Sequence, residues 1–255
     1  MGGAMLEGWL ARGLDPAAVT ILDPNASADL AARGLRVAPE AGDLTIAPPA
    51  ILVLATKPQS LDAVAPGIAS VAGPDTLVVS ILAGKTMADL RRALPDARAI
   101  VRAMPNLPAS IGRGATGAYA NEATSERQRR EADALLSANG MVEWVGSEDL
   151  IDAVTALSGS GPAYIFHLAE AMAEAGAAAG LEPALAARLA RATVVGAAAL
   201  LGESPLEPAQ LRQNVTSQGG TTAAALDVLM AEDGLRPLMR EAVAAAKRRA
   251  AELSG

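Results

Sequence analysis

Short apolar runs alternate with helix-like segments through the first half of the chain. Each run is followed within three residues by proline, glycine or asparagine, residues that commonly end strands. Bare apolar strands that alternate with helices predict a parallel sheet covered on both faces. The predicted strands span 19–22, 51–55, 77–81, 99–104, 115–120 and 141–145, and the predicted helices span 1–10, 26–33 and 125–139. The fold class is therefore α/β, with a Rossmann-like, doubly wound sheet.

Beyond Gly146 the strand pattern stops. The remaining predicted helices span 148–157, 162–180, 183–201, 220–230 and 234–253. We therefore divide the chain into a dinucleotide-binding domain, 1–146, and an all-helical domain, 147–255. The helix at 162–180 is apolar around most of its circumference, which predicts burial. A second subunit could bury it, and an ordinary core helix within one subunit is the alternative.

The start of the chain departs from the usual dinucleotide-binding pattern. In a doubly wound sheet, a glycine-rich turn between the first strand and the first helix binds the cofactor pyrophosphate. Here the chain begins in a helix and keeps only Met1-Gly2, with Gly2 as the third glycine. Asp23 ends the next strand, where an acidic residue binds the adenosine ribose. We expect that the first, central strand is missing and that codons upstream of Met1 encode it.

Composition excludes several functional classes. Hydrophobic residues make up 51% and charged residues 19%, a globular mixture, and the net charge of −7 argues against a nucleic-acid partner. The sequence has no cysteine and one histidine, so it predicts no disulfide, no thiolate nucleophile and no metal site of cysteines or several histidines. With no visible signal or membrane-spanning segment, we expect a cytoplasmic protein with no membrane partner.

A second glycine-rich stretch, NVTSQGGTT at 214–222, runs directly into the helix predicted at 220–230. Backbone N–H groups, hydroxyls and a helix N-terminus converge there, and together they form an anion site. No residue in the stretch is basic, so a small carboxylate fits better than a polyphosphate. The alternative is that Thr221 or Thr222 caps the helix and the glycines form a tight turn.

Three stretches carry a family resemblance: RAMPNLP at 102–108, TALSGSGPAY at 155–164 and VTSQGGTT at 215–222. In order and spacing they resemble the signature segments of the pyrroline-5-carboxylate reductase family, and the similarity runs from Met1 almost to the C-terminus. The family begins with a strand and Gly-x-Gly-x-Met-Gly, of which only Met1-Gly2 is present here. Proline is common where this chain has Gln218, a variable position.

The resemblance implies a dinucleotide domain, a helical dimerisation and substrate domain, and an active site between them. It also implies reduction of 1-pyrroline-5-carboxylate to L-proline by NADPH or NADH in a homodimer or a higher oligomer of dimers. The implied cofactor contacts are Met1, Gly2, Asp23, Thr56, Lys57, Pro58, Ser80, Ile81, Ala83, Gly84, Met104, Pro105 and Asn106. The implied substrate contacts are Asn214, Val215, Ser217, Gly219, Gly220, Thr221 and Thr222, with Ser217 and Thr222 as catalytic candidates.

The implied chemistry agrees with the scarcity of acid–base side chains. A protonated cyclic imine accepts hydride without a strong protein acid, so the enzyme mainly orients the nicotinamide C4 against the ring C5. His167 is therefore predicted to be structural or solvated. Lys57 is either a cofactor contact or a solvated loop residue. Arg102 either pairs with an acid beside the site or forms an ordinary structural salt bridge.

Two other readings compete. One is a reductase of a different imine or of a 3-hydroxy acid, although the hydroxy-acid enzymes use a lysine on the long interdomain helix and 162–180 contains none. The other is a nucleotide-binding regulator or an inactive homologue. Retention of the whole 214–222 stretch argues against a regulator, which needs no carboxylate site.

Overall fold

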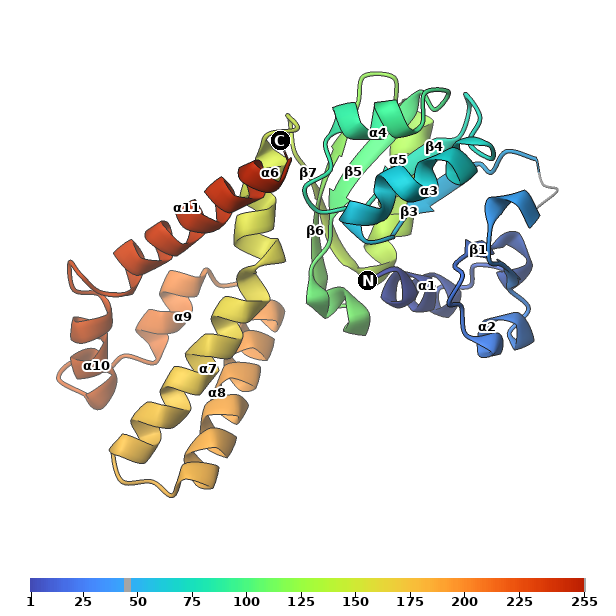
Figure 1. Cartoon of the computed structure of the whole chain (residues 1–255). Coiled ribbons are helices and arrows are strands. Elements are labelled where there is room, and N and C mark those ends of the chain that lie inside the picture. The colour runs from blue at the N-terminus through green and yellow to red at the C-terminus, as the bar shows by residue number, and fades with distance from the viewer. Residues whose placement is uncertain (44–46, 255) are drawn as a thin grey trace. The chain divides into compact units, whose positions relative to one another are not determined.

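The computed structural model describes residues 1–43 and 47–254, which form two compact units (Figure 1). The first unit comprises Met1–Gly159 together with Ala246–Gly255, and the second comprises Ser160–Ala245. The final helix thus begins in the second unit and ends in the first. Division at Gly146 remains a sequence-based prediction.

The first unit contains all the strands that the structure describes. They are β1 (Thr20–Leu22), β2 (Arg36–Ala38), β3 (Ile51–Leu54), β4 (Leu77–Ser80), β5 (Ala99–Met104), β6 (Gly114–Ala120) and β7 (Gly140–Trp144). Its α-helices are α1 (Gly2–Ala11), α2 (Ala28–Ala32), α3 (Leu61–Ala69), α4 (Met87–Ala93), α5 (Glu126–Leu136) and α6 (Leu150–Val154). The short turns are η1 (Pro16–Ala18), η2 (Ala41–Asp43), η3 (Pro58–Ser60), η4 (Leu107–Ile111), η5 (Ser137–Asn139) and the π-helical η6 (Thr155–Gly159).

All six predicted strands are confirmed, but the expectation of a wholly parallel sheet is wrong. In the order β3-β4-β5-β6-β7, strands β5 and β6 pair antiparallel, with Arg102 opposite Tyr119, and the other neighbours are parallel. The physical reason is the connection between them. A parallel crossover needs a dozen or more residues, and the single turn η4 reverses the chain instead.

A separate two-stranded parallel sheet contains β1 and β2, with Thr20 opposite Arg36 and Leu22 opposite Ala38. The edge strand β2 was not predicted from the sequence, and α2 is shorter than the predicted helix because it begins only after its N-cap Ser27. Within the described residues, no strand joins β1 to β3.

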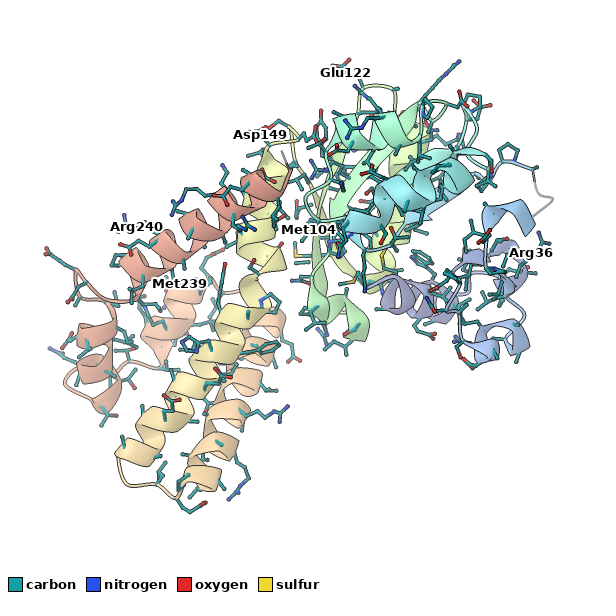
Figure 2. All side chains as sticks on the ribbon, viewed as in Figure 1. Arg36, Met104, Glu122, Asp149, Met239 and Arg240 are labelled. Atoms are coloured by element: carbon teal, nitrogen blue, oxygen red, sulfur yellow. The ribbon has the colours of Figure 1, made fainter. Side chains whose placement is uncertain are left out.

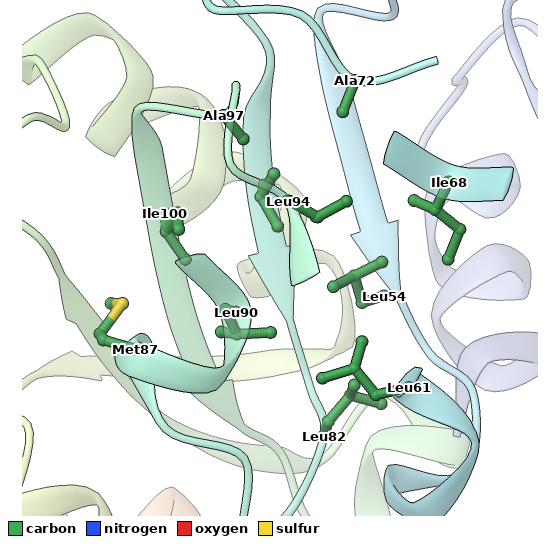
Figure 3. Packing of buried hydrophobic residues seen from close by; sticks show 11 residues of the cluster. Leu54, Leu61, Ile68, Ala72, Leu82, Met87, Leu90, Leu94, Ala97 and Ile100 are labelled. Atoms are coloured by element: carbon green, nitrogen blue, oxygen red, sulfur yellow. The ribbon is translucent and has the colours of Figure 1, made fainter. Parts of the chain in front are cut away.

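The core lies on both faces of the five-stranded sheet, as the bare apolar strands predict. Neighbouring residues point to opposite faces, so Val78 and Ile100 join one cluster with Leu54, Leu61 and Leu90 (Figure 3). Leu77, Val79, Ala99 and Val101 join the other cluster, in which α1 contributes Met5 and α5 contributes Ala132 and Leu136.

The second unit is helical, as predicted. Its elements are α7 (Gly161–Ala178), α8 (Pro183–Glu203), α9 (Pro208–Asn214), α10 (Thr221–Leu229) and the start of α11 (Leu235–Ser254). A Cβ added at Gly176 would lie 3.2 Å from the Ala186 Cβ, so this glycine allows α7 and α8 to pack closely. The helix α9 was not predicted from the sequence.

Much of the apolar surface of α7 and α8 is uncovered in the single described chain. No residue of α7 is fully buried, and on α8 only Ala186 and Ala190 are. By length and composition α8 is apolar enough to span a membrane, with a mean hydropathy of 1.5. Helices in protein cores satisfy the same criteria, so this finding alone assigns no membrane role.

Candidate active site

The predicted cofactor residues of three strands lie at one edge of the sheet. Leu54, Ser80 and Arg102 are in register on the parallel strands β3, β4 and β5, so the residues that follow them emerge side by side. The carboxyl ends of parallel strands are where doubly wound sheets bind their ligands. The residues that this register brings to the edge are Thr56, Lys57 and Pro58 after β3, Ile81, Ala83 and Gly84 after β4, and Met104, Pro105 and Asn106 at the end of β5.

The N-terminus of α1 lies at the same edge. A Cβ added at Gly2 would lie 2.9 Å from the Ala55 Cβ, just beyond β3, so only glycine allows this approach. Close helix–strand packing is the role of the third glycine in the dinucleotide fingerprint. No side chain caps α1, and space is open at Gly3. The first-turn N–H groups therefore fit a dinucleotide pyrophosphate.

The side chains at the ends of β3 and β4 differ in their exposure to solvent. Thr56 and Lys57 are exposed, and Lys57 forms no ion pair with any residue that the structure describes, so its role as a contact or as a solvated lysine stays open. Ser80 is buried, and its hydroxyl accepts a hydrogen bond from the Leu82 N–H (3.3 Å), so it shapes the turn from inside. Gly84 has a φ of 72°, a left-handed conformation that favours glycine.

Two of the three signature stretches meet at the end of β5. The buried Asn106 side chain donates to the Ser158 carbonyl (3.1 Å) and accepts from the Ala115 N–H (2.9 Å). A Cβ at Gly159 would lie 3.0 Å from the Met104 Cε, so this glycine makes room for the partly exposed Met104 (Figure 2). The glycine-rich elbow that follows α6 therefore supports the Met104–Asn106 loop directly.

Asp23 lies just beyond β1 and is exposed. One carboxylate oxygen accepts from the Asn25 N–H (2.8 Å), while Ser27 is the N-cap of α2, so Asp23 does not cap that helix. Arg33 donates twice to Glu7, at 2.7 and 2.9 Å. This hydrogen-bonded pair lowers the pKa of Glu7 and raises that of Arg33. Arg33 is thus engaged away from Asp23.

Arg102 is a buried side chain that pairs with Glu148, a residue that the sequence analysis did not single out. The same Glu148 Oε1 accepts from the Met87 N–H (2.7 Å) at the start of α4. A capping box of Thr86 and Asp89 also begins α4. The sequence signal that could have indicated Glu148 is its place in a short acidic turn between the last strand and the first helix of the second half.

The third signature stretch lies in the second unit and leads into α10. Gly219 has a φ of 70°, and the Gly220 N–H donates to the Ser217 carbonyl (3.0 Å). Gly220 is the N-cap, and no side chain caps the helix, so the alternative that Thr221 or Thr222 caps it is wrong. A Cβ at Gly220 would lie 2.4 Å from the Ser217 Oγ, which places this hydroxyl at the helix start.

The rest of this loop is held by α9. The Gln210 side chain donates to the Asn214 side-chain oxygen (2.9 Å), and the Thr216 hydroxyl donates to the Arg212 carbonyl (2.6 Å). Val215 is exposed and ends α9, whereas Thr222 is half-buried. The arrangement leaves the first-turn N–H groups of α10 and two hydroxyls, Ser217 and Thr222, for an anion.

His167 lies on α7, three residues after the second signature stretch ends at Tyr164. Its ring Nδ1 is 3.2 Å from Glu170 Oε2, and its side chain is 82% exposed. Among the residues that the structure describes, no three His, Cys, Asp or Glu side chains form a metal-binding group.

The fold and these strand-end loops define an oxidoreductase with a dinucleotide domain and a helical dimerisation domain. Residues 1–84 match the family model described as NADP oxidoreductase coenzyme F420-dependent, and residues 148–253 match that described as pyrroline-5-carboxylate reductase dimerisation. The pyrroline-5-carboxylate reductase of Pseudomonas aeruginosa is 41% identical over 256 residues, covering 100% of this chain and 93% of that protein. That of Synechocystis sp. is 48% identical over 205 residues, 80% of this chain and 74% of that protein. The chain belongs to the pyrroline-5-carboxylate reductase family.

Solved structures agree with this assignment. The pyrroline-5-carboxylate reductase from Coxiella burnetii has a TM-score of 0.89 and 38% identity, covering 100% of this chain and 95% of that chain. The pyrroline carboxylate reductase of Plasmodium falciparum with NADP bound has a TM-score of 0.82 and 25% identity, over 100% and 95% of the two chains.

Proposed function

We propose that this protein reduces 1-pyrroline-5-carboxylate to L-proline with NADPH or NADH. The observation that carries the proposal is the structural setting of the three signature stretches of the family. Two of them meet at the end of β5 through the Asn106 side chain. The third opens α10 with a helix N-terminus that no side chain caps.

The first unit supplies the proposed cofactor site. The first turn of α1, after Met1 and Gly2, would bind the pyrophosphate, and Asp23 would bind the adenosine ribose. The loops after β3 and β4 would flank the dinucleotide, with Met104, Pro105 and Asn106 beside the nicotinamide. When bound, the reduced nicotinamide supplies the hydride for C5 of the imine.

The second unit supplies the proposed substrate site. The N–H groups of Thr221 and Thr222 and the hydroxyls of Ser217 and Thr222 would bind the carboxylate, with Gly219 and Gly220 allowing a close backbone approach. Asn214 and Val215 would flank it. The loop has no basic side chain, so a single small carboxylate matches its donors. These groups orient a ring that is already protonated, and no side chain of the loop needs to donate a proton.

Assembly is part of the proposal. The family to which the chain belongs carries a dimerisation domain, here at 148–253, which makes the protein a homo-oligomer. We infer that α7 and α8 pack against the same helices of a second subunit, because they carry exposed apolar residues such as Ile165, Phe166 and Leu189. The helical domain of one subunit would then complete the active site of the other. A cytoplasmic location remains a prediction.

The test is NADPH oxidation by the purified protein with 1-pyrroline-5-carboxylate, with proline measured as product. The matched control substrate is 1-pyrroline, which lacks only the carboxylate. We expect one proline for each NADPH consumed and a much lower kcat/KM for 1-pyrroline. Cofactor binding without turnover of either imine would instead indicate a regulator or an inactive homologue.

A further inference from the structure

Glu148 joins two segments that are far apart in the sequence. It lies between β7 and α6, and its Oε1 accepts a hydrogen bond from the Met87 N–H at 2.7 Å. The same oxygen is paired with the Arg102 guanidinium, whose side chain is only 6% exposed, whereas that of Glu148 is 32% exposed. One carboxylate oxygen is therefore shared by a strand and by the N-terminus of a helix.

Both segments lead into the loops proposed to hold the cofactor. Arg102 lies two residues before Met104 on β5, on the strand that ends beside the nicotinamide position. Met87 is the first residue of α4 and closes the loop that contains Ile81, Ala83 and Gly84. The distance between these two loops therefore depends on the groups that Glu148 holds.

The β4–α4 loop is also confined near its middle. A Cβ added at Gly84 would lie 2.9 Å from the carbonyl oxygen of Leu253, near the end of α11. The loop is thus packed against a helix end at Gly84 and hydrogen-bonded to Glu148 at Met87. Loss of the Glu148 bond removes one of the hydrogen bonds that hold the end of the loop, and the capping box of Thr86 and Asp89 remains there.

We propose that Glu148 is a positioning residue for the dinucleotide. It fixes the β4–α4 loop to β5, so that the distance between this loop and the Met104–Asn106 loop, on the two sides of the nicotinamide site, stays constant. It touches neither substrate nor cofactor in this role. The inference rests on the proposed dinucleotide site and deepens it.

The Arg102–Glu148 pair differs from the surface ion pairs of the same unit. Removing one partner of a buried pair leaves the other charge without compensation, whereas replacing both by apolar residues of similar size often preserves stability. The pair Arg127–Glu131 on α5 is the matched control, because its side chains are 69% and 36% exposed. Surface pairs of this kind contribute little.

The experiment compares wild type with Glu148→Gln, Glu148→Ala, the double variant Arg102→Met/Glu148→Leu, and Glu131→Gln. Amide hydrogen exchange of residues 81–87 is measured in the cofactor-free protein. The dissociation constant of NADPH and the KM values of NADPH and of the imine acid are then measured for each variant. Thermal midpoints report on folding in each variant.

For Glu148→Ala we expect exchange at residues 81–87 to become at least about tenfold faster, the factor for one lost hydrogen bond of about 1.4 kcal/mol. We expect the dissociation constant and KM of NADPH to rise about tenfold, with the KM of the imine acid within about twofold of wild type. Glu148→Gln keeps an acceptor for the Met87 N–H and should lie in between. Glu131→Gln should match wild type in every measurement.

The double variant separates positioning from folding. We expect it to recover the thermal midpoint but to keep fast exchange and weak NADPH binding, because it restores packing and not the hydrogen bond to Met87. Recovery of wild-type NADPH affinity in this variant would overturn the proposal, as would equal rises in both KM values for Glu148→Gln. If wild type itself binds no NADPH, the proposed function fails, whereas the exchange of residues 81–87 still decides whether Glu148 fixes the loop.

Discussion

Cofactor preference turns on Asp23 at the carboxyl end of β1. In this fold an acidic residue there binds the ribose hydroxyls of NADH, whereas the 2′-phosphate of NADPH needs a positive or small polar neighbour. We predict that wild type accepts NADH at least as well as NADPH, and that Asp23→Ser shifts the preference strongly toward NADPH.

The structure removes the two basic residues that could offset the charge of Asp23. Arg33 is bound twice by Glu7. Arg36 is paired in register with Thr20, at the opposite end of the two-stranded sheet, so roughly three residues or about 10 Å of strand separate it from Asp23. A 2′-phosphate bound beside the Asp23 carboxylate would therefore receive no neutralising charge from Arg33 or Arg36.

The magnitude follows from two terms. A lost hydrogen bond between ribose and carboxylate weakens NADH binding by about 1.5–3 kcal/mol, at least roughly tenfold. Two unit charges about 4 Å apart in water repel by about 1 kcal/mol. A phosphate carries nearly two charges, but salt screening reduces its repulsion to a similar value. Removing this repulsion should strengthen NADPH binding about fivefold. The two factors multiply to a shift of about 50-fold in the ratio of catalytic efficiencies.

The assay is kcat/KM for NADPH and for NADH at constant ionic strength, before and after Asp23→Ser. Asp15→Ser is the control, because the Asp15 carboxylate also accepts from the N–H two residues on (2.9 Å) and lies outside the strand end. The control should leave the ratio unchanged. If Asp23→Ser also leaves it unchanged, Asp23 does not contact the ribose and the reasoning fails.

Three further predictions concern the loop, the assembly and a helix start. Ser217→Ala and Thr222→Ala should each raise the KM of the imine acid about tenfold or more and that of NADPH less than twofold; equal rises would remove the loop from the substrate site. Phe166→Glu should give monomers with little activity in sedimentation, because the charge enters an apolar contact, whereas Leu14→Glu, outside the dimerisation domain, should leave the oligomer intact. Asp89→Ala should destabilise the protein by about 1 kcal/mol at pH 7, a difference that should vanish once the pH is below the folded-state pKa of Asp89.

The last of these predictions depends on the direction of one pKa shift. Partial burial raises the pKa of Asp89. Hydrogen bonds from the Thr86 N–H and hydroxyl and from Arg92 together lower it by more, so the net pKa is below the ordinary value. A carboxyl with a lowered folded-state pKa stabilises the fold above its unfolded pKa of about 3.9, and the gain is lost as the pH falls through the folded value. A thermal midpoint difference that persists in strong acid would contradict this cause.

The sequence by itself determined the strands of the sheet and the face each apolar residue covers. Runs such as 77–79 are apolar at every position, which requires cover on both faces, and the two core clusters divide at alternate residues of β4 and β5. It also determined the helix start at the glycines of 219–220, because backbone conformation there is a local property. The four elements it did not place, β2, α3, α4 and α9, are only three to nine residues long.

The tertiary structure decided which residues distant in the sequence contact one another. Which way β6 runs, why Gly2 must lack a side chain, and what Arg102 binds all depend on residues that are distant in sequence: Glu148 is 46 positions from Arg102. Local propensity acts over a few residues, whereas close packing and the pairing of buried charges are satisfied only when the whole sheet is assembled. The sequence therefore carried the signature loops, and the assembled fold decided which side chains hold them in place.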